Sequence, residues 1–242
     1  MNKQIIAHLF ELWEQIGKHT DSFNKERGFA FTKPEPDSWP SKVYNIEVGQ
    51  INIKDVQRRI RTGEIPNSIG IPECENTKQL LESNNFCSTS KVKAMAMSTE
   101  QLYYDDIDES EFTLVDSKNK ARIFARTASA SFGYLVDTSV VQSLINKENM
   151  QLFLGRCKDD FPSCGMVYLD QNGISGIHMI GTKAEFQGLG MGKKMTRFLI
   201  NQSIKSKSNT VFLVASEAGE RIYHKLGFST YGNLESFSLT GP

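Results

Sequence analysis

Three alternate glycines form the clearest binding motif of this chain. Gly188, Gly190 and Gly192 lie in the run Gln187–Gly192, between a strand-like segment and a helix-like one. Glycines at such a junction leave backbone N–H groups uncovered at the positive end of a helix dipole, where phosphate oxygens bind. The run therefore predicts a cradle for a pyrophosphate, with a glycine-rich turn that binds nothing as the alternative.

The segments on either side fit this interpretation. Residues 173–182 alternate apolar and small side chains after a turn-like Gln171-Asn172-Gly173, as a half-buried strand does. After the glycines, Met191, Met195 and Phe198 recur at steps of three and four residues, which indicates an amphipathic helix. The sequence thus predicts a strand, a phosphate-binding turn and a helix in succession.

Two familiar phosphate motifs are excluded by spacing. A P-loop requires Gly where this chain has Gln187, and Ser or Thr where it has Lys194. A dinucleotide-binding fold requires its third glycine one residue later than Gly192. It also requires an acidic residue near the end of the next strand, and Thr210–Val214 contains none. A general nucleotide-binding domain is kept as a third functional class.

A known family fits better. Gln187, Gly190 and Gly192 match R/Q-x-x-G-x-G/A, and the segment from Val211 to Phe228 ends in Tyr-x-x-x-Gly-Phe. With these two blocks the chain resembles the GNAT superfamily of acyl-CoA-dependent N-acetyltransferases, from about Glu111 onward. Two positions depart from the family pattern: Ala184 stands where proline is common, and Ser216 where asparagine is common.

The resemblance implies a fold and a reaction. The fold is α/β (α+β), with a mixed, mostly antiparallel central sheet flanked by helices. The reaction moves an acetyl group from acetyl-CoA, as co-substrate, to a primary amine by direct attack through a tetrahedral intermediate. The alternative is a non-catalytic acyl-CoA-binding or interaction protein, which would have little need for a catalytic acid.

The resemblance also implies which residues contact the donor. Backbone N–H groups of the glycine turn would hold the pyrophosphate, the Gln187 amide would add a donor, and the acyl and pantetheine groups would lie along the preceding strand where it splays from the next. The predicted contacts are Ile180, Thr182, Gln187, Gly188, Leu189, Gly190, Met191, Gly192 and Ser216.

Two side chains are predicted to be catalytic. Tyr223 stands where a family tyrosine points at the CoA sulfur, and a phenol with a pKa near 10 suits protonation of a thiolate; a core aromatic is the alternative. His178 is the candidate base, expected on the same strand face as Ile180 two residues later. A hydrogen-bonded histidine inside the sheet is its alternative, and Glu217 and Glu185 are weaker candidates.

The amine acceptor cannot be identified from the sequence. In the family the acceptor contacts the first two helices, here Asn119–Phe132 and Thr138–Asn146, and loops around the fifth and sixth strands. An amphipathic pocket is expected there, from Phe124, Phe132, Tyr134 and Asp137. The acceptor is predicted to be a small-molecule or peptide amine.

The second half is predicted to alternate helices and strands in the family's order. The expected strands are Phe112–Val115, Gln151–Cys157, Cys164–Asp170, Ile174–Thr182 and Thr210–Val214, followed by a helix over Glu217–Leu226 and a hairpin through Phe228–Leu239. In the first half, helices are expected at the amphipathic N-terminus and over Asn52–Gly63.

The first half is interpreted as a degenerate GNAT-like repeat or an accessory domain. Residues 67–86 align without a gap on residues 209–228, with Leu81 in the place of Tyr223 and Asn85 in the place of Gly227. Its helix over Asn52–Gly63 has no glycine cradle. The predicted domains are 1–109, accessory, and 110–242, catalytic, with the acidic, solvated stretch Asp105–Glu111 as the boundary.

Composition limits the remaining function classes. Lysines and arginines balance the acidic residues at 28 each, so no basic excess points to nucleic acid. Charged and polar residues interrupt every apolar run of the N-terminal segment Met1–Glu14, which predicts neither a signal peptide nor a membrane span there. The protein is expected to be cytoplasmic, either monomer or homodimer. The four cysteines form no C-x-x-C pair and are expected to be buried or half-buried free thiols, with no metal site.

Overall fold

The protein was analysed as a computed structural model, which describes residues 1–100 and 102–241. The backbone packs into two compact units. The first contains Met1–Met95, Val214–Glu220 and the residues from Thr230 onward, and the second contains Ala96–Leu213 and Arg221–Ser229. Each unit is described by itself below.

The first unit is a small mixed sheet covered by helices. Strands β1, β2 and β3 are antiparallel, β3 and β4 pair in parallel through Val43 and Ile69, and β11 then runs antiparallel to β4. Most of β11 lies here, so the end of the chain completes this sheet. The elements are α1 (Asn2–His19), β1 (Phe23–Glu26), β2 (Phe29–Thr32), β3 (Lys42–Tyr44), α2 (Ile53–Arg61), β4 (Ile69–Pro72), α3 (Glu75–Glu82), most of β5 (Phe86–Ser98) and most of β11 (Ser229–Leu239).

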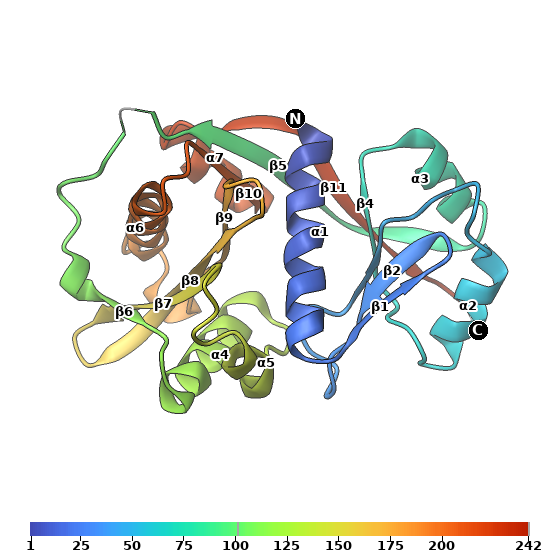
Figure 1. Ribbon diagram of the computed structural model, residues 1–242, viewed down its shortest axis with the longest axis horizontal. Coiled ribbons are helices and arrows are strands. Elements are labelled where there is room, and N and C mark those ends of the chain that lie inside the picture. The colour runs from blue at the N-terminus through green and yellow to red at the C-terminus, as the bar shows by residue number, and fades with distance from the viewer. Residues whose placement is uncertain (101, 242) are drawn as a thin grey trace. The chain divides into compact units, whose positions relative to one another are not determined.

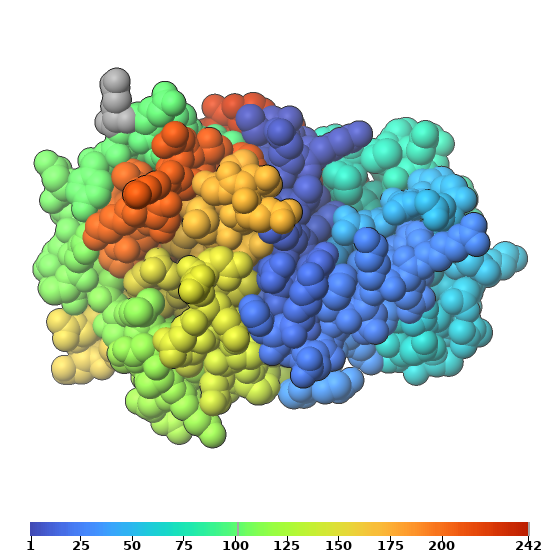
Figure 2. Space-filling view, in the orientation of Figure 1, coloured from blue at the N-terminus to red at the C-terminus, as the bar shows by residue number. Residues whose placement is uncertain are grey.

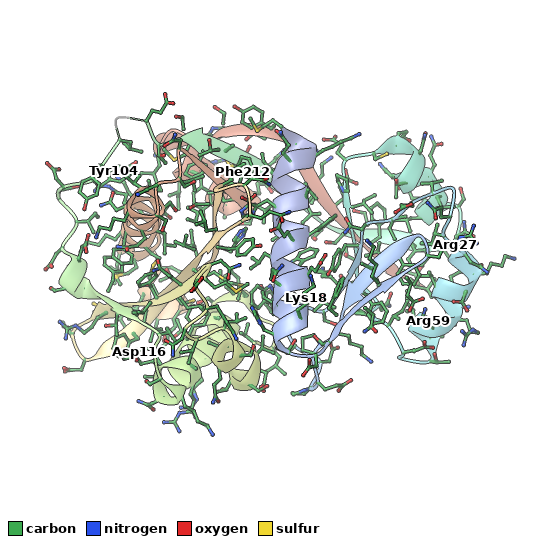
Figure 3. The ribbon with its side chains drawn as sticks, in the orientation of Figure 1. Lys18, Arg27, Arg59, Tyr104, Asp116 and Phe212 are labelled. Carbon is green, nitrogen blue, oxygen red and sulfur yellow. The ribbon has the colours of Figure 1, made fainter. Side chains whose placement is uncertain are left out.

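A buried guanidinium ties α2 to this sheet. Arg59, labelled in Figure 3, is only 8% exposed, and its guanidinium forms ion pairs with Glu26 and Glu64. The same group lies 5.8 Å from the ring centroid of Phe29 and 5.7 Å from that of Phe31. The Arg59 guanidinium therefore contacts two carboxylates and two aromatic rings at once.

The second unit contains the sheet β6-β7-β8-β9-β10. The first four strands are antiparallel and β10 joins in parallel. Figure 1 shows α6 on one side of β7, β8 and β9, with α4 and α5 on the other. The elements are β6 (Phe112–Leu114), α4 (Lys118–Phe132), α5 (Thr138–Ser143), β7 (Met150–Cys157), β8 (Asp160–Leu169), β9 (Ser175–Thr182), α6 (Met191–Lys205), β10 (Thr210–Ala215) and α7 (Glu217–Lys225); β10 and α7 each begin in one unit and end in the other.

Two glycines let the helices approach this sheet closely. A Cβ at Gly165 would lie 2.7 Å from Leu199 Cδ1 on α6, and a Cβ at Gly181 would lie 2.7 Å from Ser131 Cβ on α4. The two faces of the sheet can therefore be named by the helix that covers each. The mixed, mostly antiparallel sheet flanked by helices confirms the predicted fold class.

The acidic stretch before β6 lies along α6. Arg197 of α6 pairs with Asp106 and covers the ring of Tyr104 at 4.3 Å, and Lys194 binds Glu111 at 2.9 Å. Figure 2 shows this green segment beside the red-orange helix, and Figure 3 labels Tyr104 there. The stretch is mostly exposed, as expected. Asp105–Glu111 is called the acidic strap below, because its ion pairs hold it along α6.

Most predicted elements of the second half are confirmed within two residues at each end. Three differences stand out: β8 starts four residues earlier than expected, at Asp160, α5 ends at Ser143, and no hairpin forms between Phe228 and Leu239. The last of these predictions was wrong because β11 is one continuous strand over Ser229–Leu239. Its apolar alternation fits a strand equally well without a reversal.

The two halves share one order of elements. In both, three antiparallel strands are followed by a helix, a parallel strand, a second helix and a long strand. The aligned residues Asn85 and Gly227 both have positive φ, 61° and 98°, just before a buried phenylalanine. Asparagine tolerates this conformation better than most residues do. The repeat and the domain boundaries at 109/110 stay predictions.

The described residues contain free cysteines only, but their burial differs from expectation. Cys164 is buried and Cys157 is half-buried, whereas Cys74 and Cys87 are exposed. Among the same residues, no helix is both long enough and apolar enough to cross a bilayer. No group of three His, Cys, Asp or Glu side chains in that part of the chain could hold a metal ion.

Replacing Arg59 should destabilise the first unit. We expect Arg59→Met to lower the free energy of unfolding by about 2 kcal/mol, because the substitution leaves Glu26 and Glu64 without their cation. The matched control is Arg58→Met on the same helix, whose ion pair with Asp55 is exposed and should contribute less than about 0.5 kcal/mol. Urea unfolding of both variants measures the difference, and equal losses would contradict the assigned role.

Candidate functional site

The glycine turn is open and requires glycine. Gly188 and Gly190 both have a φ of 79°, a conformation that other residues adopt only with strain. A Cβ at either position would meet nothing within 4 Å. Gly190 is the N-cap of α6 and supplies no side-chain cap, so the first N–H groups of α6 have neither a side-chain cap nor an intrahelical partner.

The residues beside these glycines have different environments. Leu189 is 64% exposed, whereas Met191 is buried under the first turn of α6. The Gln187 side-chain amide donates to the Thr182 carbonyl at 3.3 Å, which ties the turn to the end of β9. In this arrangement the Gln187 amide, predicted to donate a hydrogen bond to the pyrophosphate, instead holds the turn. The N–H groups of the backbone remain as the candidate donors to phosphate.

A bulge in β9 is the main irregularity of the site. His178 pairs with Met166 and Gly181 pairs with Cys164, so two residues of β9, Met179 and Ile180, lie opposite one residue of β8, Gly165. Met179, inside this bulge, has a φ of 53°, which is uncommon for a residue other than glycine. Its carbonyl accepts a hydrogen bond from the Cys164 thiol at 3.4 Å. β-Bulges of this kind redirect side chains and are frequent next to active sites.

The bulge places His178 and Ile180 on opposite faces. Cross-strand partners share a face, and Met166 and Cys164 are two residues apart on β8, so His178 and Gly181 both point to the α4 side. Thr182 points to the α6 side, where its hydroxyl would lie 3.8 Å from a Cβ at Gly192. Ile180 shares that side. The expectation that His178 and Ile180 share a face was therefore wrong, because simple alternation fails at a bulge.

The strand next to β9 leaves it early. β10 pairs with β9 only at Ser175 and Gly176, through Val211 and Phe212. From Ile177 to Thr182, the described register pairs β9 with β8 alone. The backbone edge of β9 beside Ile180 and Thr182 is thus outside the parallel ladder, as the predicted splay requires.

Tyr223 is held by a residue of α6. Its phenol hydrogen-bonds with the hydroxyl of Thr196, which itself donates to the Gly192 carbonyl at 2.8 Å. Burial raises the pKa of Tyr223 to about 12, although the bond with Thr196 opposes the rise. The ring also packs edge-on against Phe228 at 5.8 Å. The phenol therefore keeps its proton at neutral pH and is connected to the first turn of α6.

Two side chains that contact predicted site residues or the bulge were not singled out from the sequence. Thr196 is 1% exposed, and its position in the sequence is that of an ordinary helix residue. Its hydrogen bond with Tyr223 is what connects it to the candidate site. Cys164 is fully buried, and burial raises the pKa of its thiol to about 12, so it packs and donates rather than acts as a nucleophile. No local pattern marks either residue.

The predicted acceptor residues fall into two groups. Phe124 is fully buried in the core, and the Asp137 carboxylate caps α5 by accepting from the Ser139 N–H at 2.7 Å. Phe132 and Tyr134, in contrast, lie against β9: a Cβ at Gly181 would lie 3.2 Å from Phe132 Cε2, and the Tyr134 hydroxyl is 3.9 Å from Met179 Sδ. Only the aromatic pair contacts the bulge.

Three further candidates lie at helix starts. Ser216 belongs to the first unit, where its hydroxyl accepts from the Gly219 N–H at 3.3 Å at the start of α7. Glu217 opens α7 itself, and Glu185 lies in the short 3-10 turn Ala184–Phe186. Ser216 thus has a local capping role, and donor binding by Ser216 stays a prediction.

Comparison with known proteins gave one family and several similar structures. A sequence model described as the Acetyltransferase (GNAT) domain matches residues 96–237. A GCN5-related N-acetyltransferase from Kribbella flavida is similar in structure with a TM-score of 0.71 at 14% identity, over 95% of this chain and 94% of that chain. A comparison with curated proteins gave no match.

Two other solved structures are similar over most of the chain. A GCN5-related N-acetyltransferase from Sphaerobacter thermophilus has a TM-score of 0.59 at 12% identity, covering 93% of this chain and 84% of that chain. A glucosamine N-acetyltransferase region of a fungal multi-domain β-N-acetylglucosaminidase has a TM-score of 0.60 at 8% identity, covering 93% of this chain and 34% of that chain. At these identities the likeness shows the fold.

The hydroxyl pair between Thr196 and Tyr223 should be measurable as a coupling energy. We expect Thr196→Val and Tyr223→Phe each to lower the free energy of unfolding, and the double variant to lose about 1 kcal/mol less than the sum, because both single changes break the same bond. Urea unfolding of the four proteins gives the cycle. Thr196→Ser, which keeps the hydroxyl, is the control, and strict additivity would show that the two groups do not interact.

Proposed function

Because the chain belongs to the GNAT acetyltransferase family, we propose that it transfers an acetyl group from acetyl-CoA to a primary amine. The observation that carries the proposal is the open glycine turn beside the unpaired edge of β9, with Tyr223 connected through Thr196 to the helix that the turn begins. Acetyl-CoA supplies an activated thioester carbonyl. The chain supplies binding, positioning and proton transfer.

The backbone of the turn would hold the pyrophosphate. The surroundings of Gly188 and Gly190 are open, and the α6 dipole adds positive potential at its N-terminus, so backbone N–H groups from Gly188 to Gly192 would be the donors. Of the two lysines in this first turn, Lys194 is engaged by Glu111 and Lys193 is exposed. In this proposal the backbone N–H groups are the main phosphate contacts, and Lys193 adds positive charge in the same turn.

The thioester arm would lie along β9 on the α6 side. Ile180 and Thr182 share that side, and the edge of β9 beside them is not used by β10. Unused backbone groups on such an edge can pair with the amides of an extended arm, much as a strand would. The donor would thus be held by main-chain bonds at both its phosphate and its thioester ends.

His178 and Tyr223 would handle the protons. His178 points to the α4 side, where an imidazole can accept a proton from the attacking amine at neutral pH. Tyr223 would act as the general acid, donating its hydroxyl proton to the departing thiolate as the C–S bond breaks. Burial raises the pKa of Tyr223 to about 12, so the phenol holds this proton until the thiolate forms.

Blocking the glycine turn should abolish donor binding. We expect Gly190→Leu to weaken CoA binding by about a hundredfold, or roughly 2.7 kcal/mol, because its side chain covers the backbone donors. Gly173→Leu is the matched control, since Gly173 has a φ of 76° and equally open surroundings but lies in a different turn. Calorimetric titration with CoA measures both, and an unchanged dissociation constant for Gly190→Leu would remove the turn from the site.

Removing the Tyr223 hydroxyl should slow turnover while the donor still binds. We expect Tyr223→Phe to lower kcat by about ten- to a thousandfold, equivalent to roughly 1.4 to 4 kcal/mol of transition-state stabilisation. The exposed Tyr231 supplies the control Tyr231→Phe, which should keep the parent rate. Release of free CoA thiol with a panel of amines gives the rates. If Tyr223→Phe is fully active, another group protonates the thiolate.

The same panel decides between the two functional classes. An acetyltransferase releases CoA steadily in the presence of its amine, whereas an acyl-CoA-binding protein binds acetyl-CoA and releases none. Binding without turnover across the whole panel would favour the non-catalytic alternative.

A further inference from the structure

An aromatic pair, half-buried Phe132 and exposed Tyr134, lies at the end of α4. Phe132 and Tyr134 stack with ring centroids 5.5 Å apart and an interplanar angle of 11°. Gly133 between them ends α4 in the left-handed conformation, with a φ of 75°, which turns both rings to one side. Tyr134 is 45% exposed and the next residue, Leu135, 49% exposed, so apolar surface remains open to solvent here.

This aromatic pair contacts the bulge on the side to which His178 points. Phe132 packs against Gly181, and the Tyr134 hydroxyl points at Met179 Sδ. Because Gly181 and His178 share the α4 face, the two rings border the face of β9 that carries the candidate base. Burial of the hydroxyl end raises the pKa of Tyr134, so its inner end is shielded while part of the residue stays open.

The two helices next to the pair carry no carboxylate for a second ammonium group. α4 contains no acidic residue, and α5 carries no charge at all. The nearest carboxylate along the chain, Asp137, is engaged in capping α5. A second cation of a polyamine or a lysine-rich peptide would find no acidic partner on either helix, which favours an amine with a single charge.

We propose that the acceptor is a monoamine joined through a short alkyl chain to an aromatic ring, and that the ring packs on Phe132, Tyr134 and Leu135. The inference rests on the proposed function and specifies its acceptor. A flat ring fits the flat face of an aromatic side chain, and a monoamine that passes its proton to His178 attacks as the neutral amine and brings no second cation that needs a partner. Tyr134 is then a specificity residue, acting through its ring.

The first experiment compares three primary amines as acceptors. Release of CoA thiol is measured with 2-phenylethylamine, with putrescine, which is a diamine without a ring, and with glucosamine, which is polar. We expect kcat/KM for 2-phenylethylamine to exceed the other two by about 10- to 100-fold, mainly through a lower KM. A preference for putrescine or glucosamine would overturn the inference and leave the proposed function intact.

Variants of Tyr134 test the contact itself. Tyr134→Ala should reduce the ratio of kcat/KM between 2-phenylethylamine and glucosamine by about tenfold, while Tyr134→Phe, which keeps the ring, should retain the ratio. Tyr103→Ala removes another exposed tyrosine, 50% exposed and before β6, and should leave the ratio unchanged. An unchanged CoA dissociation constant for Tyr134→Ala shows that the fold and donor site survive. A ratio that Tyr134→Ala does not alter would overturn the role of this residue.

A binding measurement separates failure of the inference from failure of the proposed function. 2-Phenylethylamine is titrated calorimetrically into the parent protein and Tyr134→Ala in the presence of saturating CoA. Binding that weakens about tenfold in the variant supports the aromatic site even if no amine is acetylated, in which case only the proposed reaction is wrong. Absence of binding to the parent protein overturns the aromatic site.

Discussion

The backbone reversal at Met179 is the constraint on which the candidate site depends. A single extra residue in β9, with a positive φ, breaks the alternation of side chains between Cys164 and Met166 of the neighbouring strand. A non-glycine residue in that conformation costs on the order of 1 kcal/mol or more, so the surrounding contacts must impose it. The hydrogen bond from Cys164 and the packing of Phe132 and Ser131 against Gly181 are such contacts.

The bulge gives the sheet two chemically different faces. Ile180 and Thr182 lie on the α6 face with the glycine turn, whereas His178 lies on the α4 face with Phe132 and Tyr134. A regular strand would place His178 and Ile180 on one side and crowd both substrates there. In the proposed reaction, the donor on one side and the acceptor on the other would meet at the edge of β9 that β10 leaves unpaired.

The helix α6 connects most of the remaining parts. Its first turn begins at the open glycines, Thr196 holds Tyr223, and its outer side chains bind the acidic strap through Arg197 and Lys194. These contacts fix the helix at its N-terminal end, where a mobile terminus would spread the backbone donors apart. Positioning of the donor is in this view a property of the whole helix and not of the glycines alone.

Local patterns in the sequence were sufficient for the glycine turn and the amphipathic helices, because each depends on residues close together in the chain, whereas the order of helices and strands in the second half was expected from the resemblance to the family. Glycine is the residue that adopts a left-handed conformation without strain, as Gly190 does at the start of α6. The spacing of Met191, Met195 and Phe198 is that of one face of a helix. The tertiary structure alone decided the bulge at Met179, the bond between Thr196 and Tyr223, the tie from Gln187 to Thr182 and the continuous last strand. These features depend on partners distant in sequence or on the register between strands. A bulge moves the following side chains to the other face of the sheet, and the alternation of residue types along the strand does not reveal where it occurs.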